Sequence, residues 1–119
     1  MPRILVVDDN AFMRSNLKSV LTGAGFEVVA EATDGLEAIS MYQSSAPDLV
    51  TLDITMPNMD GVQALRELRS LDPEARIVMV SALGQEALVV EAITAGAADF
   101  VVKPFQPQRV VDAVNKALV

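Results

Sequence analysis

The chain has 119 residues, enough for one domain that buries its own core, and 16 acidic against 9 basic side chains give it a formal charge of -7. It contains neither cysteine nor histidine, which excludes disulfides, thiol nucleophiles, the usual zinc sites and histidine general bases. The negative charge repels a phosphate backbone, so we expect no direct binding to nucleic acid.

The first residues contain only a short apolar run. Residues 4–7 are apolar, and the acids Asp8 and Asp9 follow at once, so the run is too short for a signal peptide or a membrane span. We therefore expect a single cytoplasmic domain over residues 1–119 that does not insert into a membrane.

The first predicted element is a strand over residues 4–7. Its continuous apolar run is typical of a central strand that is buried on both faces, and it ends in the carboxylates of Asp8 and Asp9. A helix follows over residues 11–21, where apolar side chains recur at helical spacing until Gly23 and Gly25 end it.

The second strand spans residues 26–30 and has an apolar centre between two glutamates, which indicates an edge position in the sheet. Asp34 then stands three residues before Glu37, as in a capping box with aspartate as the cap. The spacing predicts a second helix that continues to about residue 44.

The third strand covers residues 49–53, an apolar run bounded by Pro47 and Pro57. It ends in one carboxylate, Asp53. This end of a buried strand belongs to the edge at which open α/β sheets bind ligands. The dipeptide Asp60-Gly61 signals a turn before a third helix, whose apolar positions are Val62, Leu65 and Leu68.

The last part of the chain repeats the alternation of strand and helix twice. A fourth strand over residues 76–81 ends in Ser81, and a helix over residues 85–95 stops at Gly96. A fifth strand over residues 99–104 carries Lys103 and is broken by a proline. The apolar positions of the final helix are Val110, Val111, Val114, Ala117 and Leu118.

Five strands that alternate with five helices predict an α/β fold, a doubly wound five-stranded parallel sheet with helices on both faces. Parallel strands need crossover connections, and these are right-handed. The carboxyl ends of such strands meet at one edge. Four of the predicted strands bring polar side chains to that edge, namely Asp8, Asp9, Asp53, Ser81 and Lys103.

Three carboxylates and one lysine leave an excess of about two negative charges at this edge, and like charges at short range disfavour ionisation. A cation should therefore sit among them, and carboxylate oxygens with water suit Mg²⁺ better than Ca²⁺. Mg²⁺ is the usual partner of a transferring phosphoryl group, and an aspartate can be the nucleophile. We predict that role for Asp53, with Lys103 and Ser81 as contacts of the phosphoryl oxygens.

Further residues accompany the polar strand ends. Met56-Pro57 and Asp60-Gly61 follow Asp53, Ala82 follows Ser81, and Pro104-Phe105 follows Lys103. Together with Asp8-Asp9, these motifs resemble the response-regulator receiver domains of two-component signalling over the whole chain. The resemblance implies the strand order 2-1-3-4-5 of that family and a phosphoacceptor signalling domain rather than an enzyme.

The resemblance also implies a role for each site residue. Asp53 would accept a phosphoryl group from the phosphohistidine of a histidine kinase. Mg²⁺ would be bound by Asp53, by Asp9 directly, by Asp8 mostly through water, and by the backbone carbonyl of Thr55. Lys103 would pair with the phosphoryl oxygens, next to a cis Lys103-Pro104 bond.

Two residues would form a switch in a protein of this family. Ser81 would turn inward to bond the phosphoryl group, and Phe100, which stands where many chemotaxis members carry tyrosine, would follow it. The output surface would comprise the fourth helix, the fifth strand and the fifth helix, roughly residues 85–118.

Within the family, the motifs are most similar to stand-alone chemotaxis members. We therefore expect a monomer that carries a signal from a chemotaxis histidine kinase to the flagellar motor switch protein. A receiver of a phosphorelay, or of a longer regulator with another output target, remains an alternative. A phosphatase with an aspartate nucleophile is disfavoured, because Thr55 stands where such enzymes carry a second aspartate.

The same residues also have simpler interpretations when each is taken alone. Asp8 and Asp9 could cap the first helix, and Ser81 could cap the fourth. Lys103 could extend its ammonium group to water, and Phe100 could belong to the core. The convergence of the polar residues at one predicted edge favours the site over these alternatives.

Overall fold

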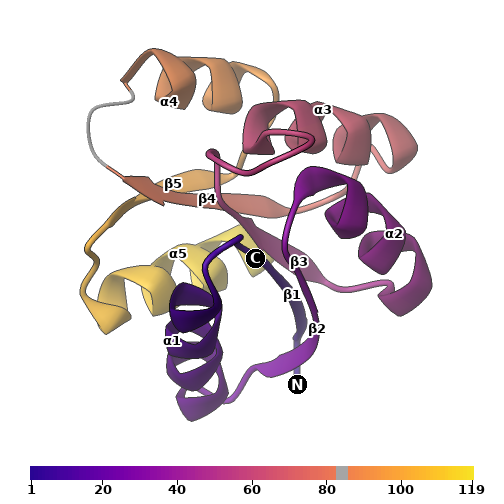
Figure 1. Ribbon diagram of the computed structural model, residues 1–119. Helices are drawn as coiled ribbons and strands as arrows, with labels where there is room; N and C mark the ends of the chain where they lie inside the picture. Colours follow the sequence, from indigo (N-terminus) through magenta and orange to yellow (C-terminus); the bar gives the residue numbers. More distant parts are fainter. Residues whose placement is uncertain (83–85) are drawn as a thin grey trace.

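The computed structural model describes residues 1–82 and 86–119, so the predicted start of the fourth helix, residue 85, lies outside the described residues. All strands run parallel in one sheet of order β2-β1-β3-β4-β5, which confirms the predicted fold (Figure 1). The strands are β1 (Arg3–Val7), β2 (Glu27–Ala32), β3 (Leu49–Leu52), β4 (Ile77–Ala82) and β5 (Asp99–Lys103). The helices are α1 (Ala11–Gly23), α2 (Gly35–Ser45), α3 (Gly61–Leu71), α4 (Glu86–Thr94) and α5 (Pro107–Leu118).

The helices form a layer on each face of the sheet. Helices α1 and α5 pack on one face, and α2, α3 and α4 pack on the other (Figure 1). The central strands are therefore buried on both sides, as their apolar runs predict. Strand β2 lies at an edge and exposes Glu27 and Glu31, as predicted. In the described part of the chain, no helix has the length and apolar character needed to cross a lipid bilayer.

The helix starts follow the local signals, with one difference. Asp34 caps α2 by accepting from the Glu37 backbone N–H at 2.8 Å, as predicted. The Glu37 side chain, however, accepts from the N–H of Thr33 at 2.9 Å, one residue before the cap, so the reciprocal bond of a capping box is displaced. Helix α5 begins at Pro107, ahead of its apolar stripe, because proline is favoured in the first turn.

The register between β1 and β3 determines where their polar ends lie. Val7 stands opposite Leu52, and the N–H of Asp53 donates to the Val7 carbonyl at 3.0 Å. Asp8 and Asp53 therefore leave the sheet side by side. On the other side of β3, Ser81 near the end of β4 lies opposite Val102 of β5.

One side chain inside the sheet is poorly accommodated. Thr51 lies between Val6 of β1 and Val78 of β4 and is fully buried. Its Oγ1 has no hydrogen-bond partner among the described residues. A buried hydroxyl group without a partner costs about 1–3 kcal/mol, so Thr51 lowers the stability of the fold.

We expect Thr51→Val to raise the free energy of unfolding by about 1 kcal/mol, because valine keeps the shape and removes the orphaned hydroxyl. Thr51→Ser is the matched control. It keeps the hydroxyl and loses a methyl group, so it should lower stability by about 1 kcal/mol. Urea unfolding of both variants measures the difference, and a valine variant less stable than the wild type would contradict the assignment.

Candidate functional site

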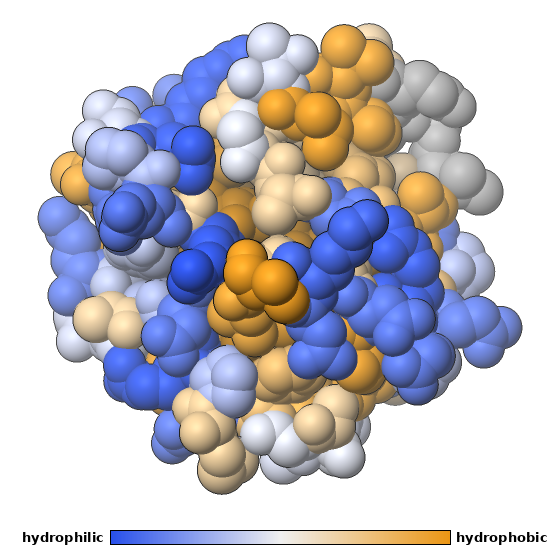
Figure 2. All heavy atoms as spheres, turned by 180° about the vertical axis from the view of Figure 1, so that it is seen from behind, coloured by the Kyte–Doolittle hydropathy of each residue, from blue (hydrophilic) through white to orange (hydrophobic). Residues whose placement is uncertain are grey.

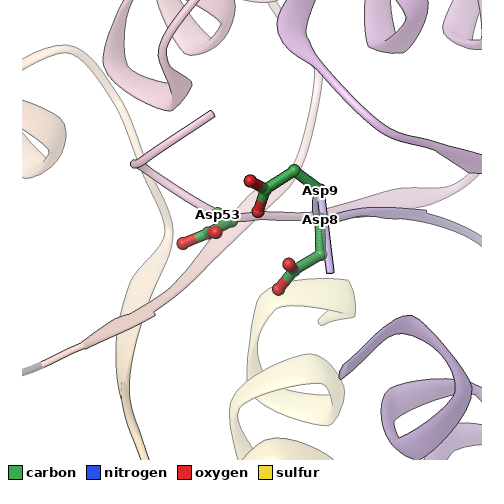
Figure 3. A group of neighbouring side chains, drawn as sticks. All are labelled: Asp8, Asp9 and Asp53. Atoms are coloured by element: carbon green, nitrogen blue, oxygen red, sulfur yellow. The ribbon is translucent and has the colours of Figure 1, made fainter. Parts of the chain in front are cut away.

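Three carboxylates meet at the carboxyl edge of the sheet, as predicted. Asp8 and Asp9 follow β1, and Asp53 follows β3. Strand β3 ends at Leu52, one residue before the predicted end, so Asp53 is the first residue after the strand. One oxygen from each residue lies within 4.8 Å of the others (Figure 3). Asp8 and Asp53 are only 1% and 6% exposed, whereas Asp9 is exposed. Two of the three negative charges are therefore withdrawn from water.

Lys103 supplies the positive charge that this group of acids needs. Its Nζ lies 2.7 Å from Asp8 Oδ2 and 3.6 Å from Asp53 Oδ2, and its side chain is 16% exposed. The Lys103–Pro104 peptide bond that follows is cis, as the resemblance implies. Lys103 thus belongs to the site rather than to the solvent, and its nearest partner is Asp8.

The two acids after β1 have different surroundings. The Asp8 carboxylate is already engaged, since Oδ1 accepts from the Asn10 N–H at 2.9 Å and Oδ2 accepts from Lys103. The Asp9 carboxylate has no recorded hydrogen bond or ion pair within the described ranges. Asp9 is therefore the acid most open to a ligand.

These surroundings fit Mg²⁺. The donors are hard carboxylate oxygens, which this ion prefers. One ammonium group against three carboxylates leaves an excess of negative charge that a divalent cation would neutralise. Asp9, Asp8 and Asp53 could hold the ion together with water. Thr55 is exposed in the loop after Asp53, and the role of its backbone carbonyl as a further ligand stays a prediction.

Burial dominates the electrostatics of Asp53. Desolvation raises the pKa of its carboxyl group above the ordinary value, Lys103 opposes this rise, and Asp8 adds to it. Hydrogen bonds from the Ser81 hydroxyl and from the Ile54 N–H, the latter at 2.8 Å, also stabilise the ionised form. The carboxylate is thus held in a fixed orientation at the strand end, as a nucleophile requires.

Ser81 and Phe100 occupy different parts of the structure. Ser81 is buried, and its hydroxyl group lowers the pKa of the Asp53 carboxyl group, so the structure brings it into the site. Phe100 is partly buried and packs against the core under α2, α3 and α4. It lies opposite Met79 in the sheet. The proposed coupling between Ser81 and Phe100 stays a prediction.

Sequence reasoning missed the role of Gly61, which was interpreted only as part of a turn. The N–H of Gly61 donates to the Ile54 carbonyl at 2.7 Å, which brings the start of α3 against the backbone next to Asp53. A Cβ atom at residue 61 would lie 1.9 Å from the Asp53 carbonyl oxygen. Only glycine, which has no Cβ atom, allows the two backbone segments to come this close. In the sequence, the glycine at the first position of the predicted helix could have indicated such a contact.

The loop between β3 and α3 is also attached to the start of α2. The Gly35 N–H donates to the Met59 carbonyl at 3.2 Å, and the Asn58 side chain donates to Asp34 Oδ2 at 2.7 Å. Asn58 has a φ of 67°, a conformation that asparagine tolerates better than most residues. These contacts fix the path of the loop that contains Thr55.

Comparisons with known proteins point in the same direction as the geometry. Residues 4–115 match the family described as "Response regulator receiver domain". The chain is 58% identical to "Chemotaxis protein CheY" of Thermotoga maritima, over 96% of this chain and 95% of that protein. It is 58% identical to "Chemotaxis protein CheY" of Bacillus subtilis, over 98% of this chain and 97% of that protein.

A solved structure is similar over nearly the whole chain. It is the "CheX-CheY-BeF3-Mg+2 complex" from Borrelia burgdorferi, which matches with a TM-score of 0.94 and 40% identity, over 98% of this chain and 89% of that chain. The "response regulator domain of Thermotoga maritima CheB" matches with a TM-score of 0.89 and 37% identity, over 100% of this chain and 98% of that chain.

We expect Gly61→Ala to lower the free energy of unfolding by about 2 kcal/mol and to displace Asp53, because a methyl group cannot fit against its carbonyl. Gly23→Ala is the control, since a Cβ atom there meets nothing within 4 Å. Its stability should be unchanged or slightly higher. Urea unfolding and the backbone amide spectrum measure the two effects, and an undisturbed Asp53 region in Gly61→Ala would contradict the prediction.

The pKa of Asp53 predicts a pH dependence of stability in the absence of metal. A carboxyl group whose pKa is raised on folding binds its proton more tightly in the folded state, so its contribution to stability falls as pH rises from below 3.8 through the raised value. Asp53→Asn removes this loss. In EDTA, we compare the free energy of unfolding of the variant with that of the wild type at two pH values. The difference in favour of the variant should be larger at neutral pH than below pH 3.8. A constant difference across that range would contradict the assignment.

Proposed function

This chain belongs to the response regulator receiver family and is closely related to CheY, and from that premise we propose that it accepts a phosphoryl group on Asp53 and carries a chemotaxis signal in the cytoplasm. The observation that carries the proposal is the environment of the Asp53 carboxylate. It is buried at a strand end, 3.6 Å from the Lys103 ammonium group and beside two further carboxylates. Such an arrangement of opposed charges in a buried place is typical of a reactive group.

The proposed reaction is a transfer between a kinase histidine and Asp53. A carboxylate oxygen of Asp53 attacks the phosphorus atom, and the bond from phosphorus to the imidazole nitrogen breaks. The imidazole, protonated on its other nitrogen, leaves as a neutral ring, and Asp53 becomes an acyl phosphate. The protein supplies position and charge for this step rather than further covalent chemistry.

Mg²⁺, held by Asp9, Asp8 and Asp53, would supply positive charge to the phosphoryl oxygens. The similarity to a structure that contains Mg²⁺ and BeF3 supports this assignment. Before the reaction, the Lys103 Nζ atom lies closer to Asp8 than to Asp53: it is 2.7 Å from Asp8 Oδ2 and 3.6 Å from Asp53 Oδ2. In the proposed mechanism its ammonium group turns from Asp8 to a phosphoryl oxygen, and the Ser81 hydroxyl donates to another.

The chain's own residues support a signalling domain over a turnover enzyme. Phosphatases with an aspartate nucleophile use a second acid two residues later, and this chain has Thr55 there. No histidine is present to replace that acid. We therefore propose self-catalysed phosphotransfer and only slow loss of the phosphoryl group.

The proposed output surface comprises α4, β5 and α5. Val90 and Ile93 of α4 are 67% and 48% exposed, and Val102 of the edge strand β5 is 37% exposed. Figure 2 shows hydrophobic residues gathered toward the top of the molecule, the side on which α4 lies. An apolar surface on a helix beside an open sheet edge suits a short amphipathic segment of a partner. We propose the N-terminal segment of the flagellar motor switch protein as that partner.

The test combines phosphorylation with binding. The wild type and Asp53→Asn are treated with acetyl phosphate and Mg²⁺, and intact mass reports the addition of one phosphoryl group. A peptide from the N-terminus of the motor switch protein is then titrated into each sample. We expect modification of the wild type alone and tighter peptide binding only in the modified wild type.

Each other outcome removes a defined part of the proposal. An unmodified wild type, or equal modification of Asp53→Asn, would refute Asp53 as the acceptor. Full modification without tighter peptide binding would keep the receiver and reject the motor partner, and would favour a phosphorelay or another output target.

A further inference from the structure

The guanidinium group of Arg14 reaches from α1 back to the site without touching a carboxylate of the site. Its Nη1 donates to the Asp8 backbone carbonyl at 2.8 Å. Its Nε lies 3.3 Å from Glu31 Oε1 on the edge strand β2, and the Arg14 side chain is only 17% exposed. Arg14 thus connects three segments, the end of β1, the first half of α1 and the end of β2.

The bonded carbonyl belongs to the peptide unit that leads into Asp9. This unit is planar, so fixing the Asp8 carbonyl also fixes the Asp9 N–H and the direction in which the chain leaves β1. The Asp8 N–H is held as well, since it donates to the Ala32 carbonyl of β2 at 3.1 Å. Arg14 and β2 therefore hold the backbone on both sides of Asp8.

Asp9 needs this backbone support more than its neighbours do. The carboxylates of Asp8 and Asp53 are oriented by hydrogen bonds to their own oxygens. The Asp9 carboxylate has no such recorded bond within the part of the chain that the structure describes. Its position near the other two acids, within 4.8 Å, therefore depends on the backbone that presents it.

We propose that Arg14 is a positioning residue for the metal: by holding the Asp8–Asp9 peptide, it presents the Asp9 carboxylate to a divalent cation. The proposal rests on the proposed function, because it takes this edge to be the Mg²⁺ site. Glu31 keeps the guanidinium group in place and offsets its charge, which would otherwise oppose a nearby cation. Arg14 itself contacts neither the metal nor the phosphoryl group.

A positioning role and a simple charge effect predict opposite results. If Arg14 acted only through its positive charge, its removal would reduce repulsion and tighten Mg²⁺ binding. If it positions Asp9, its removal loosens the ligand and weakens Mg²⁺ binding. Loss of residues that orient metal ligands typically weakens metal affinity by about 10- to 100-fold.

The experiment is a calorimetric titration of Mg²⁺ into the full chain, without a phosphoryl donor. We expect Arg14→Met to bind Mg²⁺ about tenfold more weakly than the wild type. Lys18→Met is the matched control, because Lys18 also approaches Glu31, at 3.8 Å, but has no recorded contact with Asp8. Its Mg²⁺ affinity should remain within about twofold of the wild type, since exposed charges are screened.

Phosphorylation kinetics give a second measurement that a general loss of structure would not reproduce. With acetyl phosphate, the Mg²⁺ concentration for half-maximal modification of Arg14→Met should rise about tenfold, while the rate at saturating Mg²⁺ stays near that of the wild type. If Arg14→Met does not fold, Arg14→Leu, which also lacks a donor for the Asp8 carbonyl, separates the charge effect from the positioning effect in the same way. Equal or tighter Mg²⁺ binding in the folded variant would overturn the positioning role. A wild type that binds no Mg²⁺, or is not modified at Asp53, would instead refute the proposed function.

Discussion

The ion pair between the Lys103 ammonium group and Asp8, at 2.7 Å, allows buried acids to share one edge of the sheet. Without a positive charge among them, Asp8 and Asp53 would repel each other in a place that water does not screen. The pairing also requires the whole fold, because β3 and β4 lie between the strands that carry Asp8 and Lys103. The order of the strands and the polar site thus depend on each other. The strands must end at the same edge so that the Lys103 ammonium group can offset the negative charges of the buried acids.

Around these charges, each neighbouring helix contributes backbone positioning rather than further chemistry. Helix α1 holds the Asp8 carbonyl through Arg14, and the start of α3 packs against Asp53 at Gly61. The start of α2 holds the loop between β3 and α3, through the bond from Asn58 to Asp34. The acidic side chains are therefore oriented before any ligand binds. This lowers the free-energy cost of rearranging them during the proposed phosphoryl transfer.

The parts of this arrangement that sequence could predict are those written in local patterns. Continuous apolar runs predicted the buried strands. The polar residues after these runs predicted the edge of the sheet at which Asp53, Ser81 and Lys103 lie. The glycine at the first position of α3 was a signal for some close approach, but its contact with Asp53 could not be predicted, because it arises from how α3 packs after the loop closes. The same holds for Thr51, which the register places between valines of two other strands and whose hydroxyl group has no partner among the described residues. Local sequence patterns predict where helices and strands lie. The contacts between them can be predicted only once the packing and the strand register are known.

Within the proposed output surface, the side-chain connections of α4 and α5 differ in strength, and this difference indicates which helix would respond to a change at the site. Helix α5 is tied to β5 by Arg109, which donates to both Asp99 carboxylate oxygens and to the Phe100 carbonyl at 3.1 Å. Between α3 and α4, Arg66 and Glu91 form an ion pair with a single recorded hydrogen bond and with side chains that are 56% and 41% exposed, and such pairs contribute little. Ser81, whose hydroxyl group influences the pKa of Asp53, lies opposite Val102 of the apolar surface. A change at Ser81 therefore has a short route to β5, and on the proposed function we expect α4 to be the helix whose position shifts between pre-existing states.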